Sequence, residues 1–200
     1  MLWSAPRKPL PFIVTVPATV TAPLAMNVSR PPLAPFQGGA VKVAPAATVT
    51  VVTARRAVEH VVNDVVALDG FTATAFLTVS ITPPIIVVSV TASSSALALL
   101  RESAGFAVNF LNPEQAELAG AFARPQAERV ALWKSIAWTP DAQEVPLLAG
   151  TTGAFSAKVR QIVDAGDHAL VLGDVTAIHL GEGSDTLVYH NRAYGRVARA

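Results

Sequence analysis

The sequence contains no cysteine. This absence excludes disulfide bonds, thiolate metal sites and cysteine nucleophiles. Charged residues are also scarce, at 14% of the 200 residues, and the 15 basic and 14 acidic side chains almost cancel. Because no run of lysine or arginine is present, the chain lacks the electrostatic footprint of a nucleic-acid-binding protein. We therefore expect no nucleic acid and no polyanionic partner.

Hydrophobic residues, by contrast, make up 52% of the chain. A chain of this length forms one domain with a full core and is too short for two ordinary domains. So much apolar surface must be buried within the subunit or against another subunit. We therefore expect one main domain and an obligate oligomer.

One long stretch, residues 71–100, has no charged residue and could be mistaken for a membrane span. Pro83 and Pro84 interrupt it, and its many Thr, Ser and Val residues favour strands over a helix. The pattern predicts two buried strands, Phe71–Ile81 and Ile85–Thr91, joined by a turn. We expect no membrane association.

The N-terminal residues 1–35 are rich in Pro, Ala, Thr and Val and show no lasting helical or strand period. They are predicted to be a disordered or loosely packed extension of a domain spanning 36–200. Arg7 and Lys8 precede an uncharged stretch that loosely resembles a secretory signal, but prolines at 9, 11, 17 and 23 would interrupt its helix. Export stays open as an alternative, and a cytoplasmic protein is the expectation.

Strand patterns dominate the rest of the chain. A strand is predicted from Thr48, and further strands at 106–111, 151–164, 168–180 and 187–190. Strands that recur without helical crossovers favour an antiparallel barrel over a parallel sheet.

Helix signals are few. Ser95 is a natural N-cap for a helix over 96–102. Asn112, Pro113 and Gln115 form a capping-box-like start for a helix that runs to about Phe122. Residues 55–69 are ambiguous, because their valines have helical spacing but are β-branched, so that a helix and a hairpin are both open. A mainly β fold with a few short helices follows.

Four blocks, in order, resemble the flavin reductase-like family of FMN-binding split barrels. They are Gly70–Pro84, Ser103–Leu111, Gly166–His168 and Tyr189–Tyr194. The similarity covers about residues 36–194. It implies an antiparallel split β-barrel, a homodimer, and hydride transfer from NADH or NADPH to FMN or FAD. Family members of this type supply reduced flavin to a partner flavin-dependent monooxygenase.

The resemblance also assigns site residues. The small residues after Phe71 would bring backbone amides to the polar edge of the flavin, three serines would hold its phosphate, and His168 would take the catalytic position on the nicotinamide side. From the pattern alone, these residues would be a core strand, a helix cap and a strand-edge histidine. The implied flavin-binding residues are Thr72, Ala73, Thr74, Ala75, Ser93, Ser94, Ser95, Phe106, Gly166 and Tyr194.

The chain departs from the family pattern in three places. The segment 54–69 is longer than the usual hairpin, and the N-terminal extension has no counterpart. The serine segment 91–96 lacks the basic residue that often accompanies it in the family. Phosphate binding is therefore expected to be weaker or rearranged, and the choice between FMN and FAD is open.

Other chemistries have little support in the sequence. The four histidines, at 60, 168, 179 and 190, lack paired metal-ligand spacing. The segment 181–186 has two glycines of a dinucleotide-binding fingerprint but lacks the third. No nucleophile-elbow motif is present. A flavin carrier without reductase activity and a degenerate barrel that serves as an interaction subunit stay open as alternatives to the reductase.

Overall fold

The computed structural model describes residues 46–56, 68–181, 183 and 185–197. The predicted N-terminal extension lies outside these residues. So does most of the ambiguous segment 55–69, whose ends continue the flanking strands. None of the described helices is both long and apolar enough to cross a membrane.

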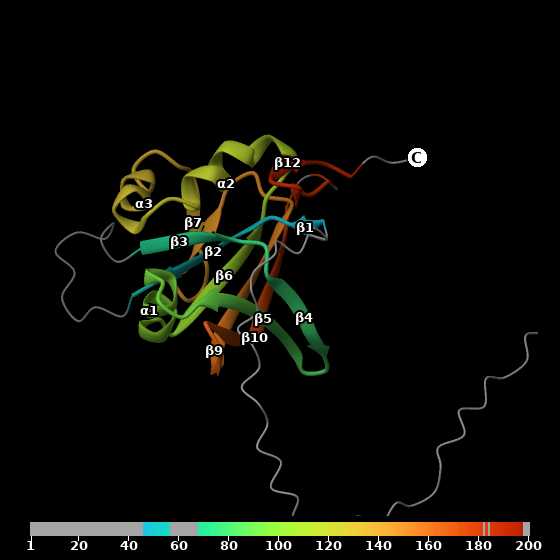
Figure 1. Cartoon of the computed structure of the whole chain (residues 1–200). Coiled ribbons are helices and arrows are strands. Elements are labelled where there is room, and N and C mark those ends of the chain that lie inside the picture. Colours follow the sequence, from blue (N-terminus) through green and yellow to red (C-terminus); the bar gives the residue numbers. More distant parts are fainter. Residues whose placement is uncertain (1–45, 57–67, 182, 184, 198–200) are drawn as a thin grey trace, which may run out of the picture. The chain divides into compact units, whose positions relative to one another are not determined.

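A seven-stranded antiparallel sheet forms the body, in the order β3-β2-β6-β9-β10-β5-β4 (Figure 1). Strands β3 (Leu68–Ala73) and β4 (Phe76–Ile81) lie at its two opposite edges, although only two residues separate them in the chain. The sheet must therefore curl until its edges approach each other, and β3 does contact β5 (Pro84–Thr91). No ladder pairs β3 with β4 or β5 among the described strands. The predicted antiparallel split β-barrel is confirmed.

Two small sheets and three short helices complete the described part. The three-stranded sheet has the order β1-β11-β12, and β7 pairs with β8. The remaining elements are β1 (Ala47–Thr48), β2 (Thr50–Arg55), α1 (Ser95–Glu102), β6 (Gly105–Phe110), the 3-10 helix η2 (Pro113–Gln115), α2 (Ala116–Phe122), α3 (Gln126–Leu132), β7 (Trp138–Pro140), β8 (Pro146–Leu148), β9 (Gly153–Ala165), β10 (His168–Leu180), β11 (Val188–His190) and β12 (Ala193–Gly195).

The single strand predicted over residues 71–81 is wrong, because the chain changes partners at Thr74 and Ala75. Ala73 pairs with Thr50 of β2, and its carbonyl accepts a hydrogen bond from the Thr50 hydroxyl at 2.8 Å. Two residues later, the Ala75 carbonyl accepts from the amide of Ser89 in β5 at 2.9 Å. A continuous run of strand-forming residues cannot reveal such a change, since both halves have the same propensity.

The helix signals are largely confirmed. Asn112 caps η2, and Gln115 reaches back to the Asn112 amide, which completes the predicted capping box. The cap of α1 is Ser94 and not Ser95: its hydroxyl accepts from the Leu97 amide, so that the helix begins one residue earlier than expected. Helix α3 was not predicted.

Two glycines allow close packing of the barrel against its surroundings. A side chain at Gly173 of β10 would meet the Phe106 ring at 2.6 Å, so Phe106 packs directly on this bare backbone. A side chain at Gly70 of β3 would meet the carbonyl oxygen of Val52 at 3.0 Å and the ring of Phe122 at 3.1 Å. Helix α2 can therefore lie close on β3, which positions one wall of the site.

Candidate functional site

A cavity of about 400 Å³ lies where the barrel is split. This volume is within the range of sites that bind small molecules or cofactors. Its walls come from segments that are far apart in the chain. They are residues 71–75, 89–91 and 94–96, with Phe122, Ala123 and Arg129.

The predicted stretch Thr72, Ala73, Thr74 and Ala75 lines this cavity. Because β3 is an edge strand, one side of its backbone has no partner strand in the described sheet. Backbone groups on such an edge are available to a ligand. The small side chains allow a flat ring to approach them closely.

The three serines have different roles in the structure. Ser94 and Ser95 line the cavity, whereas Ser93 lies exposed in the preceding turn, outside its walls. The only hydrogen of the Ser94 hydroxyl is used by the backbone, since it is donated to the Thr91 carbonyl at 2.7 Å, and the oxygen accepts from the Leu97 amide at 3.3 Å. The Ser95 hydroxyl accepts a hydrogen bond from Arg129 at 3.3 Å. The helix dipole of α1 adds partial positive charge at this end of the cavity.

Sequence reasoning missed Arg129, which supplies a cationic group to the cavity wall. Its side chain is only 7% exposed and forms a bidentate ion pair with Asp69 of β3, itself 3% exposed. The Arg129 Nε and Nη2 atoms donate to the two carboxylate oxygens at 3.1 and 2.9 Å. Helix α3 thus brings an arginine next to the serine segment, which has no basic residue of its own. No local signal could have found it, because the two partners are 60 residues apart.

His168 lies at the rim of the same region, at the start of β10. Its Nδ1 atom is 2.8 Å from the Asp167 carboxylate, and its Nε2 atom is 3.5 Å from the hydroxyl of Thr91, which lines the cavity. The hydrogen bond and the charge of His168 lower the pKa of Asp167 below its usual value. Gly166 occupies the turn before them with a positive φ of 69°, and the Asp167 carbonyl accepts from the Ala92 amide at 2.9 Å. The imidazole is therefore held beside the turn 91–94, called the serine turn below.

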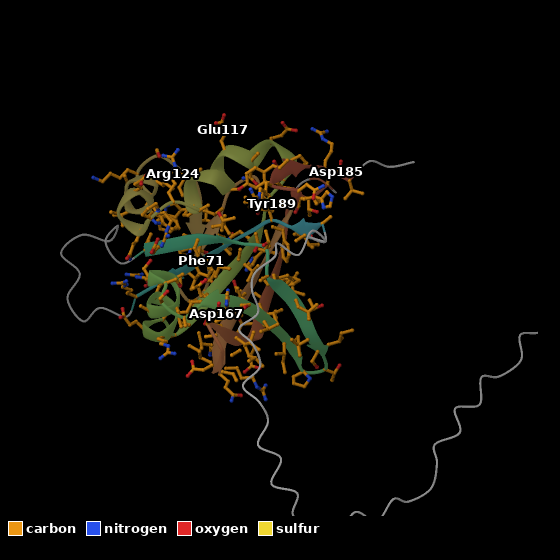
Figure 2. All side chains as sticks on the ribbon, viewed as in Figure 1. Phe71, Glu117, Arg124, Asp167, Asp185 and Tyr189 are labelled. Atoms are coloured by element: carbon orange, nitrogen blue, oxygen red, sulfur yellow. The ribbon has the colours of Figure 1, made fainter. Side chains whose placement is uncertain are left out.

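Two predicted flavin-binding residues lie elsewhere. Phe106 is fully buried in the barrel core and packs on Gly173, so it supports the sheet and does not line the cavity. Tyr194 belongs to the three-stranded sheet, with its ring 5.3 Å from that of Tyr189, and burial together with Tyr189 raises its pKa. Figure 2 shows Tyr189 well away from Asp167, with Phe71 between them. Within one described subunit, Tyr194 and the cavity are separate.

A serine and histidine also meet on the other side of β10. The Ser156 hydroxyl and His179 Nε2 are 2.9 Å apart. Both residues line a cavity of about 260 Å³, but Ser156 is only 1% exposed. The pair therefore gives little support to hydrolase chemistry, which needs an accessible nucleophile.

The cavity residues fit a flavin in three respects. Small side chains border it where a ring would lie, an edge strand offers backbone groups for the polar rim of that ring, and hydroxyl and guanidinium donors stand at one end for a phosphate. His168 and Asp167 stand beside that end. The arrangement can therefore hold a planar cofactor with an anionic tail.

Comparisons with known proteins agree with this geometry. Residues 44–198 match the model of the flavin reductase like domain. The NADH:FMN oxidoreductase of Rhodococcus qingshengii is 36% identical over 134 residues, which are 64% of this chain and 67% of that protein. A flavin reductase solved in complex with NADP+ superposes with a TM-score of 0.65 at 27% identity, covering 76% of this chain and 90% of that chain.

A further relative is longer. The reductase component of the flavin-dependent trigonelline monooxygenase of Acinetobacter baylyi is 34% identical over 131 residues. These residues are 66% of this chain but only 41% of that protein. The present chain thus spans less than half the length of that relative.

Proposed function

Since the chain belongs to the flavin reductase like domain family, we propose that it is an NAD(P)H:flavin oxidoreductase that supplies reduced flavin to a partner monooxygenase. The observation that carries this proposal is the cavity at the split of the barrel, where the bend 72–75, the serine turn and a buried arginine face one space. Relatives named as an NADH:FMN oxidoreductase and as a monooxygenase reductase component support the reaction and the partner. The functional domain is 36–200, preceded by an extension over 1–35.

In this proposal the cavity residues bind and orient the flavin and the nicotinamide cofactor. A bound FMN or FAD would supply the electron acceptor, with NADH or NADPH as the hydride donor. Residues 72–75 allow close approach of the ring and offer backbone donors where negative charge develops. Ser95 donates to the phosphate. His168 holds the nicotinamide cofactor, while the ionised Asp167 accepts from its Nδ1 atom and its Nε2 atom faces the Thr91 hydroxyl at the cavity wall. Hydride transfer needs no general acid here, so these residues act by positioning.

Both FMN and FAD carry a phosphate that these donors could hold. Ser95 and Arg129, joined by a hydrogen bond, line the cavity of about 400 Å³. The proposal therefore covers either flavin. A cytoplasmic location is proposed as well, because reduced nicotinamide cofactors are held there.

The proposed assembly is a homodimer. Strand β4 carries Leu77, Val79 and Ile81 at 62%, 52% and 89% exposure. An apolar edge strand that is neither charged nor covered invites pairing with another chain. A second copy of this chain is the occupant we propose, since half of the residues are hydrophobic and self-association would bury the excess.

One experiment tests the activity. The purified full chain is mixed with FMN and NADH, then with NADPH, and the loss of the nicotinamide absorbance is followed alongside flavin fluorescence. Catalytic nicotinamide oxidation that requires flavin supports the reductase. Flavin binding without nicotinamide oxidation would overturn it in favour of a flavin carrier, and the absence of both would favour an interaction subunit.

A further inference from the structure

A buried ion pair forms part of the cavity wall. Asp69 comes from β3 and Arg129 from α3, and both side chains are more than nine-tenths buried. Burying two charges costs on the order of several kcal/mol per ion. A protein in which a well-packed apolar pair replaces a buried ion pair is therefore often equally stable. The pair is therefore weak as a purely stabilising device, and its place in the cavity wall suggests a task toward the ligand.

The hydrogen bonds of the guanidinium show what that task is. Asp69 takes the Nε hydrogen and one Nη2 hydrogen, and the Arg124 carbonyl accepts from Nη1 at 2.8 Å. The second Nη2 hydrogen is donated to the Ser95 hydroxyl oxygen. A hydroxyl that accepts from a cation keeps its own hydrogen for another acceptor. Among the described residues, no acceptor for that Ser95 hydrogen is found.

Ser94 shows the contrast. Its hydroxyl hydrogen goes to the Thr91 carbonyl and its oxygen accepts from the Leu97 amide, so both of its roles serve the turn and the helix. Ser95 also lines the cavity, and its hydrogen is free to point into it. The two adjacent serines therefore divide the work between capping the helix and contacting a ligand.

We propose that Arg129 is a positioning residue that orients and polarises the Ser95 hydroxyl for donation to the flavin phosphate, while Asp69 fixes the guanidinium. This inference rests on the proposed function. A hydroxyl polarised by a cation is a stronger donor to an anion than an isolated one. Because Asp69 balances the charge of Arg129, the phosphate meets a directional donor without a full uncompensated cation. Such binding discriminates phosphorylated flavin and still permits its release to a second protein.

The test compares FMN with riboflavin, which has the same ring and no phosphate. Flavin fluorescence titrations give both affinities for the full chain and its variants. For Ser95→Ala we expect FMN affinity to fall about ten-fold, as for one lost charge-assisted hydrogen bond, while riboflavin affinity changes less than about two-fold. Ser95→Thr, which keeps the hydroxyl, should restore FMN affinity. Arg129→Lys should lower the ratio of FMN affinity to riboflavin affinity by several-fold. This loss should be smaller than that of Ser95→Ala and larger than that of Ser95→Thr.

Two exposed residues outside the cavity wall offer matched controls. Ser135→Ala removes an exposed hydroxyl whose bond is to the Leu132 carbonyl, and Arg124→Lys changes an exposed arginine paired with Glu128. Both should leave the affinity ratio unchanged. If Arg129→Lys does not fold, Arg129→Gln combined with Asp69→Asn keeps a neutral hydrogen-bonded pair and should show the same loss of FMN preference.

The outcomes separate this inference from the proposed function. If Ser95→Ala and the Arg129 variants leave the FMN to riboflavin ratio unchanged, the ion pair is structural and the inference is wrong, even where flavin reduction continues. If the unaltered chain reduces flavin but binds FMN and riboflavin equally, the inference also fails and the reductase stands. If the unaltered chain neither binds nor reduces flavin, the proposed function itself fails.

Discussion

Strands β3 and β4 lie at opposite edges of the same sheet, and they differ in how much of the described chain packs against them. Strand β3 contacts all three helices and contributes Asp69, one of the most deeply buried charges of the described residues. Strand β4 has no helix against it in Figure 1 and exposes Leu77, Val79 and Ile81. It also carries a register irregularity between Thr78 and Ser80.

The two edges of a split barrel carry backbone N–H and C=O groups that have no partner strand. Such an edge must be covered, protected by charges, or paired with a ligand or another chain. The β3 edge contacts the helices and borders the cavity. In the proposed function, backbone groups of this edge contact the flavin. The β4 edge is the one that we propose for pairing with a second copy of the chain.

The largest expected effect comes from breaking the buried pair at the β3 edge. Asp69→Ala leaves the guanidinium of Arg129 buried without its carboxylate and removes the acceptor of the Gly70 amide. We expect the free energy of unfolding to fall by about 3–5 kcal/mol. Urea denaturation at fixed protein concentration measures it. The control is Asp174→Ala, which breaks the exposed pair with Arg160 and should cost about 1 kcal/mol or less. Equal losses in the two variants would show that the β3 edge is no more dependent on its charges than the surface.

At the β4 edge the expected loss is in association. Leu77→Lys with Val79→Lys replaces two exposed apolar side chains by charges that a dimer interface would bury. The dimer should weaken by about 3 kcal/mol, more than a hundred-fold in its dissociation constant. Sedimentation equilibrium measures this, with Ala127→Lys and Ala131→Lys on exposed positions of α3 as the control. A dimer that survives the β4 change unaltered would place the interface elsewhere.

Packing between β3 and α2 provides a smaller effect. Gly70→Ala places a methyl group against the Val52 carbonyl, which cannot move without disturbing β2, and against the Phe122 ring. The expected cost is about 1–3 kcal/mol of unfolding free energy. Gly120→Ala, in α2 where nothing lies within contact, should instead stabilise by about 0.5–1 kcal/mol. Thermal and urea denaturation of both variants would reveal opposite signs, and a shared sign would argue against close packing of α2 on β3.

The smallest expected effect lies at the rim, beside the β3 cavity. His168→Ala removes the imidazole held by Asp167 near Thr91 and should raise the KM for NAD(P)H about ten-fold, or about 1.4 kcal/mol. Flavin affinity should barely change. Stopped-flow reduction across nicotinamide concentrations, beside a flavin titration, measures both, and His190→Ala on the exposed end of β11 is the control. A loss of flavin affinity with unchanged nicotinamide kinetics would show that His168 contacts the flavin and not the nicotinamide cofactor.

Local patterns in the sequence determined much of this protein. Alternation of apolar and polar residues predicted a strand over 151–164, close to the observed 153–165, because a strand with one buried face repeats every two residues. The strand predicted over 168–180 also matches the structure. The Asn112 and Gln115 capping box was readable because its hydrogen bonds join residues three apart. The small residues 72–75 and the serines before α1 were recognised as parts of a flavin site through their likeness to a known family, and the structure brings two of these serines and all four small residues to one cavity.

Only the tertiary structure decided which of these residues meet. The exchange of partners at Thr74 and Ala75 depends on how the sheet closes, which no strand propensity encodes. Phe106 belongs to the core because Gly173 of another strand leaves room for its ring. The Arg129 and Asp69 side chains pair across 60 residues of sequence. Their meeting follows from the packing of α3 against β3, and packing between distant segments is decided by the whole fold and not by any local pattern.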